Sequence, residues 1–194
     1  MIPLQIWIVE TFGRMTSVAA LMRTEWAWPL AESVHFIGLT LLIGTIGLFD
    51  LRLLGLGRRI PIALMHRLVP WGLAGFAVTA GSGLLFLMTE PDQYVYNVSF
   101  HLKVVFILAA GVNALVFYAT SFRQATAAGA PLDAPLLAKV VAVVSLTLWM
   151  SVIVAGRLLT FYRPFPCEPP RPRFLAACLP GDFSEYASPH ELNR

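Results

Sequence analysis

The sequence predicts an all-α membrane protein: a bundle of four transmembrane helices, preceded by an interfacial amphipathic helix and followed by an extracytoplasmic proline-rich tail. Two observations support this prediction. Of the 194 residues, 57% are hydrophobic and 13% are charged, whereas soluble domains carry roughly 25% charged residues. Four apolar segments also have the roughly 20 residues needed to cross a hydrocarbon core, at about 28–54, 68–88, 98–122 and 136–161.

The segment 1–24 differs from the four that follow it. Ile8, Phe12 and Ala19 recur at helical spacing, but Glu10 and Arg14 interrupt the apolar run. Such a pattern is typical of a helix that lies in the membrane interface. The segment also lacks a basic region and a small-residue cleavage site, so we expect no signal peptide. The predicted domains are therefore 1–24, 25–161 and 162–194.

Loop charge predicts the orientation of the bundle. The loops after the first and third apolar segments are basic, whereas the charged residues of the second loop, "TEPDQYVYN", are all acidic. Because basic loops stay in the cytoplasm, the second loop and the tail are expected outside. The net charge of +3 comes from these scattered positions and forms no patch, which argues against nucleic-acid binding.

The tail, 162–194, begins "YRPFPCEPPRPRF" and is too rich in proline to fold around a core of its own. We expect it to cover the domain or a partner. It contains both cysteines, Cys167 and Cys178. Outside the cytoplasm such a pair can form a disulfide, and two unpaired thiols are the alternative.

Two histidines fall at matching depth on different predicted helices. His35 lies six residues past Pro29, and His101 opens the segment that begins outside. At about 1.5 Å per residue, both lie in the outer third of the bundle. A six-coordinate b-type haem needs one imidazole on each side of its iron, so we predict one haem held by His35 and His101. The alternative is that each histidine only bonds to a neighbouring helix or to lipid headgroups.

Four nearby residues have predicted supporting roles. Gly38 continues the His35 face and would leave room for the macrocycle, although small residues also serve helix packing. Lys103 and Arg157 could pair with haem propionates, or they could simply extend to the interface. Glu32, one turn outside His35, could accept a hydrogen bond from the ligand's ring or exchange a proton with a quinol.

A further histidine, His66, lies on the cytoplasmic side before the second apolar segment. It is either an interfacial residue or an iron ligand of a second haem. No other histidine lies at its depth, so a second haem would need a different residue type or another subunit. We therefore expect one haem.

Three stretches carry a resemblance: "HFIGLTLLIGTIGLFDLRLLG", "FHLKVVFILAAGVNALVFY" and "WMSVIVAGRLL". Over about 28–161 the chain resembles a family of small bacterial four-helix membrane proteins, distantly similar to copper-resistance D membrane proteins and small b-type cytochromes. His35, Gly156 and Arg157 carry the resemblance. It implies a multi-pass protein of the bacterial inner membrane with a periplasmic tail.

The function that follows is electron transfer. We expect a membrane-embedded b-type haem subunit that relays electrons between quinol and an extracytoplasmic redox partner, within a larger complex. One alternative is a cofactor-free accessory subunit of a respiratory or photosynthetic complex. Another is copper transport through soft methionine ligands, although methionine usually serves packing. No nucleophile or phosphate-loop motif occurs, so any enzymatic role is that of an oxidoreductase's electron-transfer subunit.

Overall fold

The computed structural model describes residues 4–13, 16–127, 133–162, 165–166 and 178–179. Within them the regular structure is helical, as predicted, apart from one short strand pair that was not predicted. Four helices are long and apolar enough to span a membrane. They are α3 (Ala27–Leu53), α5 (Val69–Thr89), α7 (Val98–Thr120) and α9 (Leu136–Phe161), close to the predicted segments.

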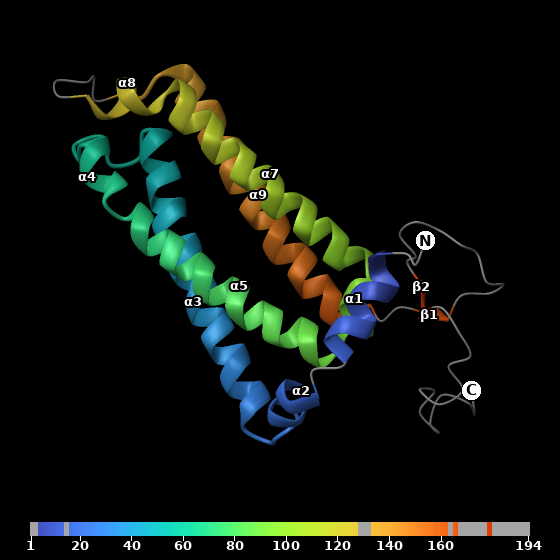
Figure 1. The fold of residues 1–194 in the computed structure, drawn as a ribbon. Helices are drawn as coiled ribbons and strands as arrows, with labels where there is room; N and C mark the ends of the chain where they lie inside the picture. Colours follow the sequence, from blue (N-terminus) through green and yellow to red (C-terminus); the bar gives the residue numbers. More distant parts are fainter. Residues whose placement is uncertain (1–3, 14–15, 128–132, 163–164, 167–177, 180–194) are drawn as a thin grey trace.

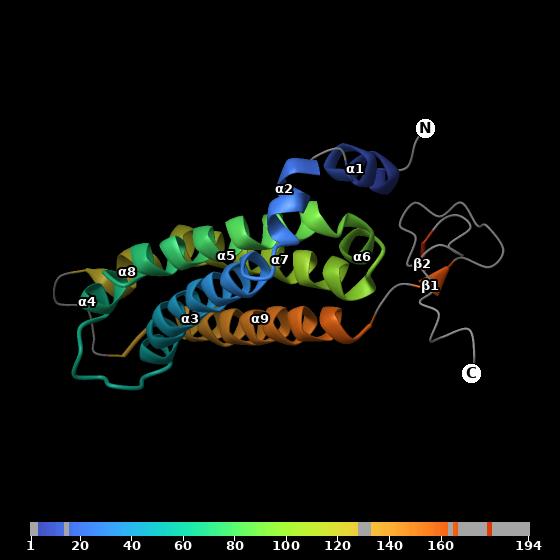
Figure 2. The ribbon, with the colours of Figure 1, turned by 90° about the horizontal axis from the view of Figure 1, so that it is seen from below.

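Short helices occupy the two ends of the bundle (Figures 1 and 2). We call the end with α6 (Pro91–Val95) the outer end, and the end with α4 (Ile62–His66) and α8 (Phe122–Thr126) the inner end. At the inner end a buried cluster joins the helices and the loops. Its members are Phe49, Leu53, Ile62, Phe117, Ala125, Ala134, Ala138, Val141 and Ala142.

The four long helices pack as two antiparallel pairs. α3 packs along α5, and α7 packs along α9, while α3 and α9 make a smaller contact that joins the pairs. Figures 1 and 2 show this arrangement. Among the described residues α5 and α7 have at most marginal contact. The bundle is therefore closed on the α3–α9 side and loosely joined on the α5–α7 side.

Small residues bring α3 and α5 close together. A Cβ atom at Gly75 would lie 2.6 Å from the Leu42 amide nitrogen and 2.7 Å from the Gly38 carbonyl oxygen. A Cβ atom at Gly38 would lie 2.6 Å from Thr79 Oγ1. Glycine at helix contacts allows backbones to approach within packing distance in a bilayer. The extensive α3–α5 contact depends on these two positions.

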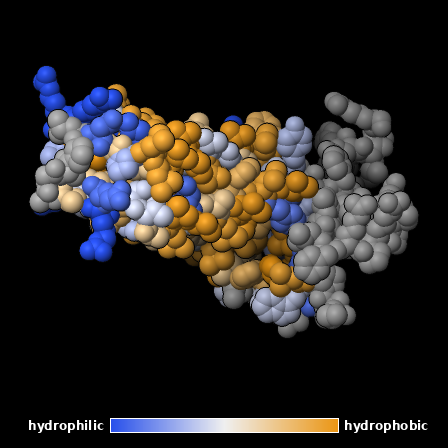
Figure 3. All heavy atoms as spheres, turned by 90° about the horizontal axis from the view of Figure 1, so that it is seen from above, coloured by the Kyte–Doolittle hydropathy of each residue, from blue (hydrophilic) through white to orange (hydrophobic). Residues whose placement is uncertain are grey.

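The surface has the distribution expected of a membrane protein. Figure 3 shows hydrophobic residues along the middle of the molecule and strongly hydrophilic ones gathered at one end. The exposed arginines Arg58, Arg59, Arg67 and Arg123 belong to the two inner loops. Many large apolar side chains on the long helices are exposed as well. The bilayer is the solvent that such a surface requires.

The N-terminal segment forms two helices where one was predicted. They are α1 (Leu4–Gly13) and α2 (Thr16–Met22). Gln5 Nε2 in α1 donates a 3.1 Å hydrogen bond to the Val95 carbonyl oxygen of α6. Met22 at the end of α2 is buried against Ala27 and Phe86. The segment is therefore attached to the outer end by side-chain contacts, and its place relative to a membrane interface stays a prediction.

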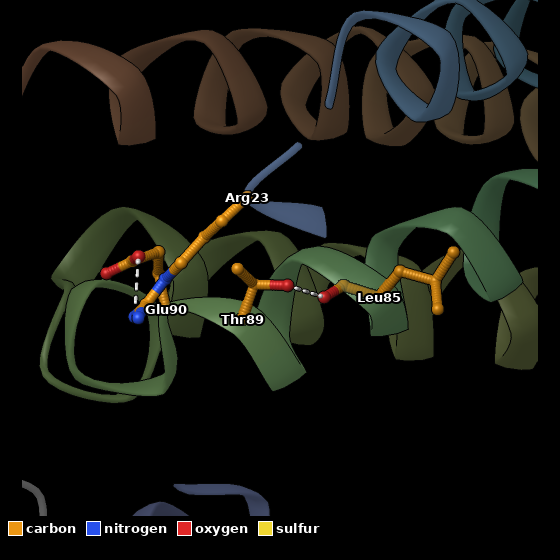
Figure 4. A network of polar contacts seen from close by, with 4 residues as sticks. All are labelled: Arg23, Leu85, Thr89 and Glu90. Atoms are coloured by element: carbon orange, nitrogen blue, oxygen red, sulfur yellow. Dashed lines mark hydrogen bonds and ion pairs between the residues drawn. The ribbon is translucent and has the colours of Figure 1, made fainter. Parts of the chain in front are cut away.

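An exposed ion pair lies beside the same attachment. Arg23 Nη2 lies 3.7 Å from Glu90 Oε1, just after α5, while Thr89 Oγ1 donates a 2.8 Å hydrogen bond to the Leu85 carbonyl oxygen (Figure 4). Exposed ion pairs contribute little stability. The buried Met22 contact therefore holds α2 in place more than the charges do.

Little of the predicted tail falls within the described residues. β1 (Phe165–Pro166) and β2 (Cys178–Leu179) form a two-residue parallel pair in which Phe165 is opposite Cys178. Cys167 lies outside the described residues. The disulfide between the two cysteines therefore stays a prediction.

Asn97 links the outer loop to the end of α9. Its side chain accepts a 2.9 Å hydrogen bond from the Ser99 amide at the start of α7 and donates to the Leu159 and Tyr162 carbonyl oxygens. The residue is buried. We expect Asn97→Ala to lower the free energy of unfolding by about 1–3 kcal/mol, because it removes a cap and leaves buried groups unpaired. Thermal unfolding in detergent measures this, and an unchanged midpoint would contradict the linking role.

Candidate site around two outer histidines

His35 lies on α3, half-buried against α5. Its Nδ1 atom is 2.9 Å from Ser82 Oγ, and the Ser82 hydroxyl itself donates to the Val78 carbonyl oxygen at 2.8 Å. Because the hydroxyl proton is directed to that carbonyl, the oxygen accepts from His35. This network assigns the proton to Nδ1 and the lone pair to Nε2.

The neighbours of the His35 ring are apolar or small. The Phe86 ring centroid lies 5.7 Å from it and the Phe36 centroid 6.4 Å. A Cβ atom at Gly83 would lie 3.6 Å from His35 Cε1, which is ordinary contact distance. Packing and one hydrogen bond together fix the orientation of the imidazole.

His101 lies in the first turn of α7 and is half-buried. Its Nε2 atom is 2.8 Å from the Val95 carbonyl oxygen of α6. A carbonyl can only accept, so the proton is on Nε2 and the lone pair is on Nδ1. The ring contact of His101 is with Phe100, at 6.4 Å between centroids. Among the described residues the His35 and His101 rings are not in contact with each other.

Lys103 on α7 is half-buried at the contact between α7 and α9. It interacts electrostatically with His35 across the helix pairs. Its Nζ atom lies 3.5 Å from where a Cβ atom at Gly156 of α9 would be. Within the described part of the chain, Lys103 has no hydrogen bond and no ion pair. A half-buried ammonium group without a counter-ion can bind an anionic group.

The other predicted residues lie elsewhere on the outer end. Arg157 is exposed, with its guanidinium carbon 5.0 Å from the centre of the Phe161 ring. Glu32 is also exposed. Its charge acts on Tyr94 of α6, whose pKa is raised to about 12 by burial first and then by the charges of Glu90 and Glu32. The hydrogen bond of the His35 ring is made with Ser82, and not with Glu32 as the sequence suggested.

Gly38 and His66 also have packing or local contacts. Gly38 lies in the contact with α5 described above, so its small size brings the helices together. His66 is at the inner end, where its Nε2 atom is 2.9 Å from the Tyr118 hydroxyl and its ring is 4.8 Å from that of Phe122. α4, which ends at His66, lies at the opposite end of the bundle from the start of α7, which carries His101 (Figure 1).

The comparison with protein families gives one match. Residues 25–162 match the model of a family of unknown function, DUF6644. The chain belongs to this family. The matched region contains all four transmembrane helices and with them His35, Ser82, His101 and Lys103. No curated protein and no solved structure matches the chain.

Ser82, which bonds to the His35 ring, was not among the residues predicted from the sequence. Its only signal is its position between Gly81 and Gly83, which does not separate a polar contact from packing. Among the residues that the structure describes, no three His, Cys, Asp or Glu side chains are grouped as metal ligands.

Proposed function

We propose that this protein is a membrane-embedded electron-transfer subunit that binds one b-type haem through His35 and His101. In this proposal it relays electrons between quinol and an extracytoplasmic redox partner, as part of a larger complex in the bacterial inner membrane. The periplasmic side of that membrane corresponds to the outer end of the bundle, by the distribution of basic loops.

The observation that carries the proposal is the hydrogen bonding of the two imidazoles. His35 donates from Nδ1 to Ser82, and His101 donates from Nε2 to the Val95 carbonyl oxygen. Histidine ligands of metals almost always donate their other ring nitrogen in this way, which fixes the tautomer and the ring orientation. Each ring therefore has one nitrogen whose lone pair is available to iron, and both lie in the outer part of the bundle.

The helix arrangement also suits a group held between the two histidines. His35 belongs to the α3–α5 pair and His101 to the α7–α9 pair, and the pairs are joined mainly through α3 and α9. A haem held by His35 on one side and His101 on the other would connect the two helix pairs, which α5 and α7 do not join directly. Facing helices of bundles bind cofactors in this manner.

The charges of Lys103 and Arg157 also support haem binding. Haem carries two propionates, and Lys103 is a half-buried cation with no counter-ion among the described residues. It is suited to one propionate, while Arg157 at the outer end of α9 is available to the other after leaving its contact with Phe161. When bound, the haem supplies a one-electron redox centre. The protein's part is to orient the imidazoles, exclude water and neutralise the propionates.

Absorption spectroscopy of the purified full-length chain tests the proposal. The protein is produced in cells supplied with haem precursor, and its reduced-minus-oxidised spectrum and its pyridine haemochrome are recorded. We expect the bands of haem b and one haem per chain. Protein that is folded but takes up no haem, either in cells or when haem is added afterwards, would contradict the proposal.

A further inference from the structure

A second candidate site lies in the inner half of the bundle, away from the two outer histidines. It is a cavity of about 240 Å³ between all four long helices. On α3 it extends from Leu42 near mid-helix to Asp50 and Leu53 near the inner end. We call it the Asp50 cavity. The proposed haem site uses none of the residues that line it.

Asp50 is the unusual residue of this cavity. It is only 4% exposed, and its Oδ2 atom has no hydrogen-bond partner among the described residues. The carboxyl group interacts with the side chain of Ser145 on α9. Arg52, two residues along α3, donates to the carbonyl oxygens of Arg58 and Ile60 in the following loop. An intramembrane carboxyl group with an unused oxygen is costly, and such groups usually mark functional sites.

Four further lining residues carry polar groups: Ser145 and Trp149 of α9, and Asn113 and Tyr118 of α7. Asn113 donates through Nδ2 to the Val141 carbonyl oxygen at 3.0 Å. Its amide oxygen has no hydrogen bond among the described residues. Asp50 Oδ2 and the Asn113 amide oxygen are therefore acceptors without a partner among the described residues, and a ligand that satisfies either must be a donor.

The rest of the cavity lining is mostly apolar and rich in aromatic rings. Phe76 and Trp149 lie 6.4 Å apart between centroids, and Phe49 and Phe117 lie 5.6 Å apart. All four line the cavity. Aromatic side chains favour offset or edge-on contacts with another ring. A planar ring that carries a hydroxyl group matches both the apolar wall and the acceptors.

The cavity also borders the open side of the bundle. Its lining includes Leu73 of α5 and Tyr118 of α7, which are 62% and 42% exposed. These two helices have at most marginal contact with each other among the described residues. A ligand dissolved in the bilayer could therefore enter between α5 and α7 without crossing water.

We propose that the Asp50 cavity binds the ring of a lipid-soluble hydroxylated aromatic molecule, the chemical class of the membrane quinols, with a ring hydroxyl donating to Asp50 Oδ2. The apolar substituent of such a molecule extends between α5 and α7 into lipid. This binding does not require haem at His35, so either proposal can fail without the other.

Two matched probes test this assignment on the full chain in lipid nanodiscs. One is a hydroquinone with a decyl chain, and the other is its dimethyl ether, which keeps the apolar shape but has no donor. Titration calorimetry measures their affinities. We expect the hydroquinone to bind at least about tenfold more tightly than the ether, the discrimination that a lost buried hydrogen bond gives. Equal affinities, or binding of neither probe, would overturn the proposal.

Variants then locate the binding. Asp50→Leu is expected to reduce hydroquinone affinity to that of the ether and to leave ether binding unchanged. Because Asp50→Leu removes an unpaired buried oxygen, we expect this variant to fold. Asp50→Asn is a second variant, in which we expect weakened hydroquinone binding. Asp92→Asn on the outer loop is the matched control and should bind as the wild type does. Unchanged hydroquinone binding in Asp50→Leu, or preference of the site for a decylammonium ion over the hydroquinone, would overturn the assignment.

Discussion

His35→Ala is expected to purify without haem, and His101→Ala is expected to lose it or to retain a weakly bound, five-coordinate form. Each substitution removes one of the two axial nitrogens. Haem content per chain, measured by pyridine haemochrome, reports the loss. We expect haem content to decrease at least about tenfold in His35→Ala. Loss of a residue that hydrogen-bonds to a metal ligand lowers metal affinity about 10- to 100-fold, and loss of the ligand itself should lower it more.

Two controls separate ligation from general damage. His66→Ala changes a histidine at the opposite end of the bundle and should keep full haem content. Ser82→Ala removes the hydrogen-bond acceptor of His35 but no ligand, so haem should bind with affinity lowered by about 10- to 100-fold. Thermal unfolding in detergent verifies that each variant is folded. Full haem content in folded His35→Ala would contradict the assignment of this ligand.

Gly75→Ala is expected to give the largest loss of stability from a single added methyl group. The new Cβ atom would lie 2.6 Å from a backbone nitrogen of α3 and 2.7 Å from a backbone oxygen. Backbone atoms cannot turn aside as a flexible side chain can, so α3 and α5 must separate. Overpacking of this kind costs about 1–3 kcal/mol. The measurement is the thermal unfolding midpoint of the purified protein in detergent.

Gly81→Ala is the matched control on the same helix. A Cβ atom at Gly81 would meet nothing within 4 Å, and alanine forms helices more readily than glycine. We therefore expect Gly81→Ala to be as stable as the wild type or slightly more stable. If both variants unfold at the wild-type temperature, the close approach of α3 and α5 is not required for stability.

The long helices could be predicted from the sequence because a bilayer demands long apolar segments and allows few alternatives. The ends of α3 and α9 agree with the expected segments to within a residue or so. The N-terminal segment was less predictable, because its two short helices are held by contacts such as that of Gln5 with Val95. Such contacts join residues distant in sequence and leave no local pattern.

The candidate site could be predicted only in part. Depth along a helix follows from residue number, so the sequence can predict that His35 and His101 lie toward the same end of the bundle. The direction of a side chain around the helix depends on which neighbour packs there. For that reason Gly38 lies against α5, and Ser82 rather than Glu32 bonds to His35. Asp50 lies near the inner end of α3, where residue number alone does not indicate that it is buried against a cavity.

The central claim is that one iron is bound by the two outer histidines. Electron paramagnetic resonance of the oxidised protein, combined with near-infrared magnetic circular dichroism, tests it most directly, because these spectra report the axial ligands of haem iron. We predict a low-spin signal with two imidazole ligands in the wild type, and a high-spin signal from whatever haem His101→Ala retains. A wild-type protein that carries haem with any other pair of axial ligands, or whose spectrum is unchanged in His101→Ala, would contradict the account.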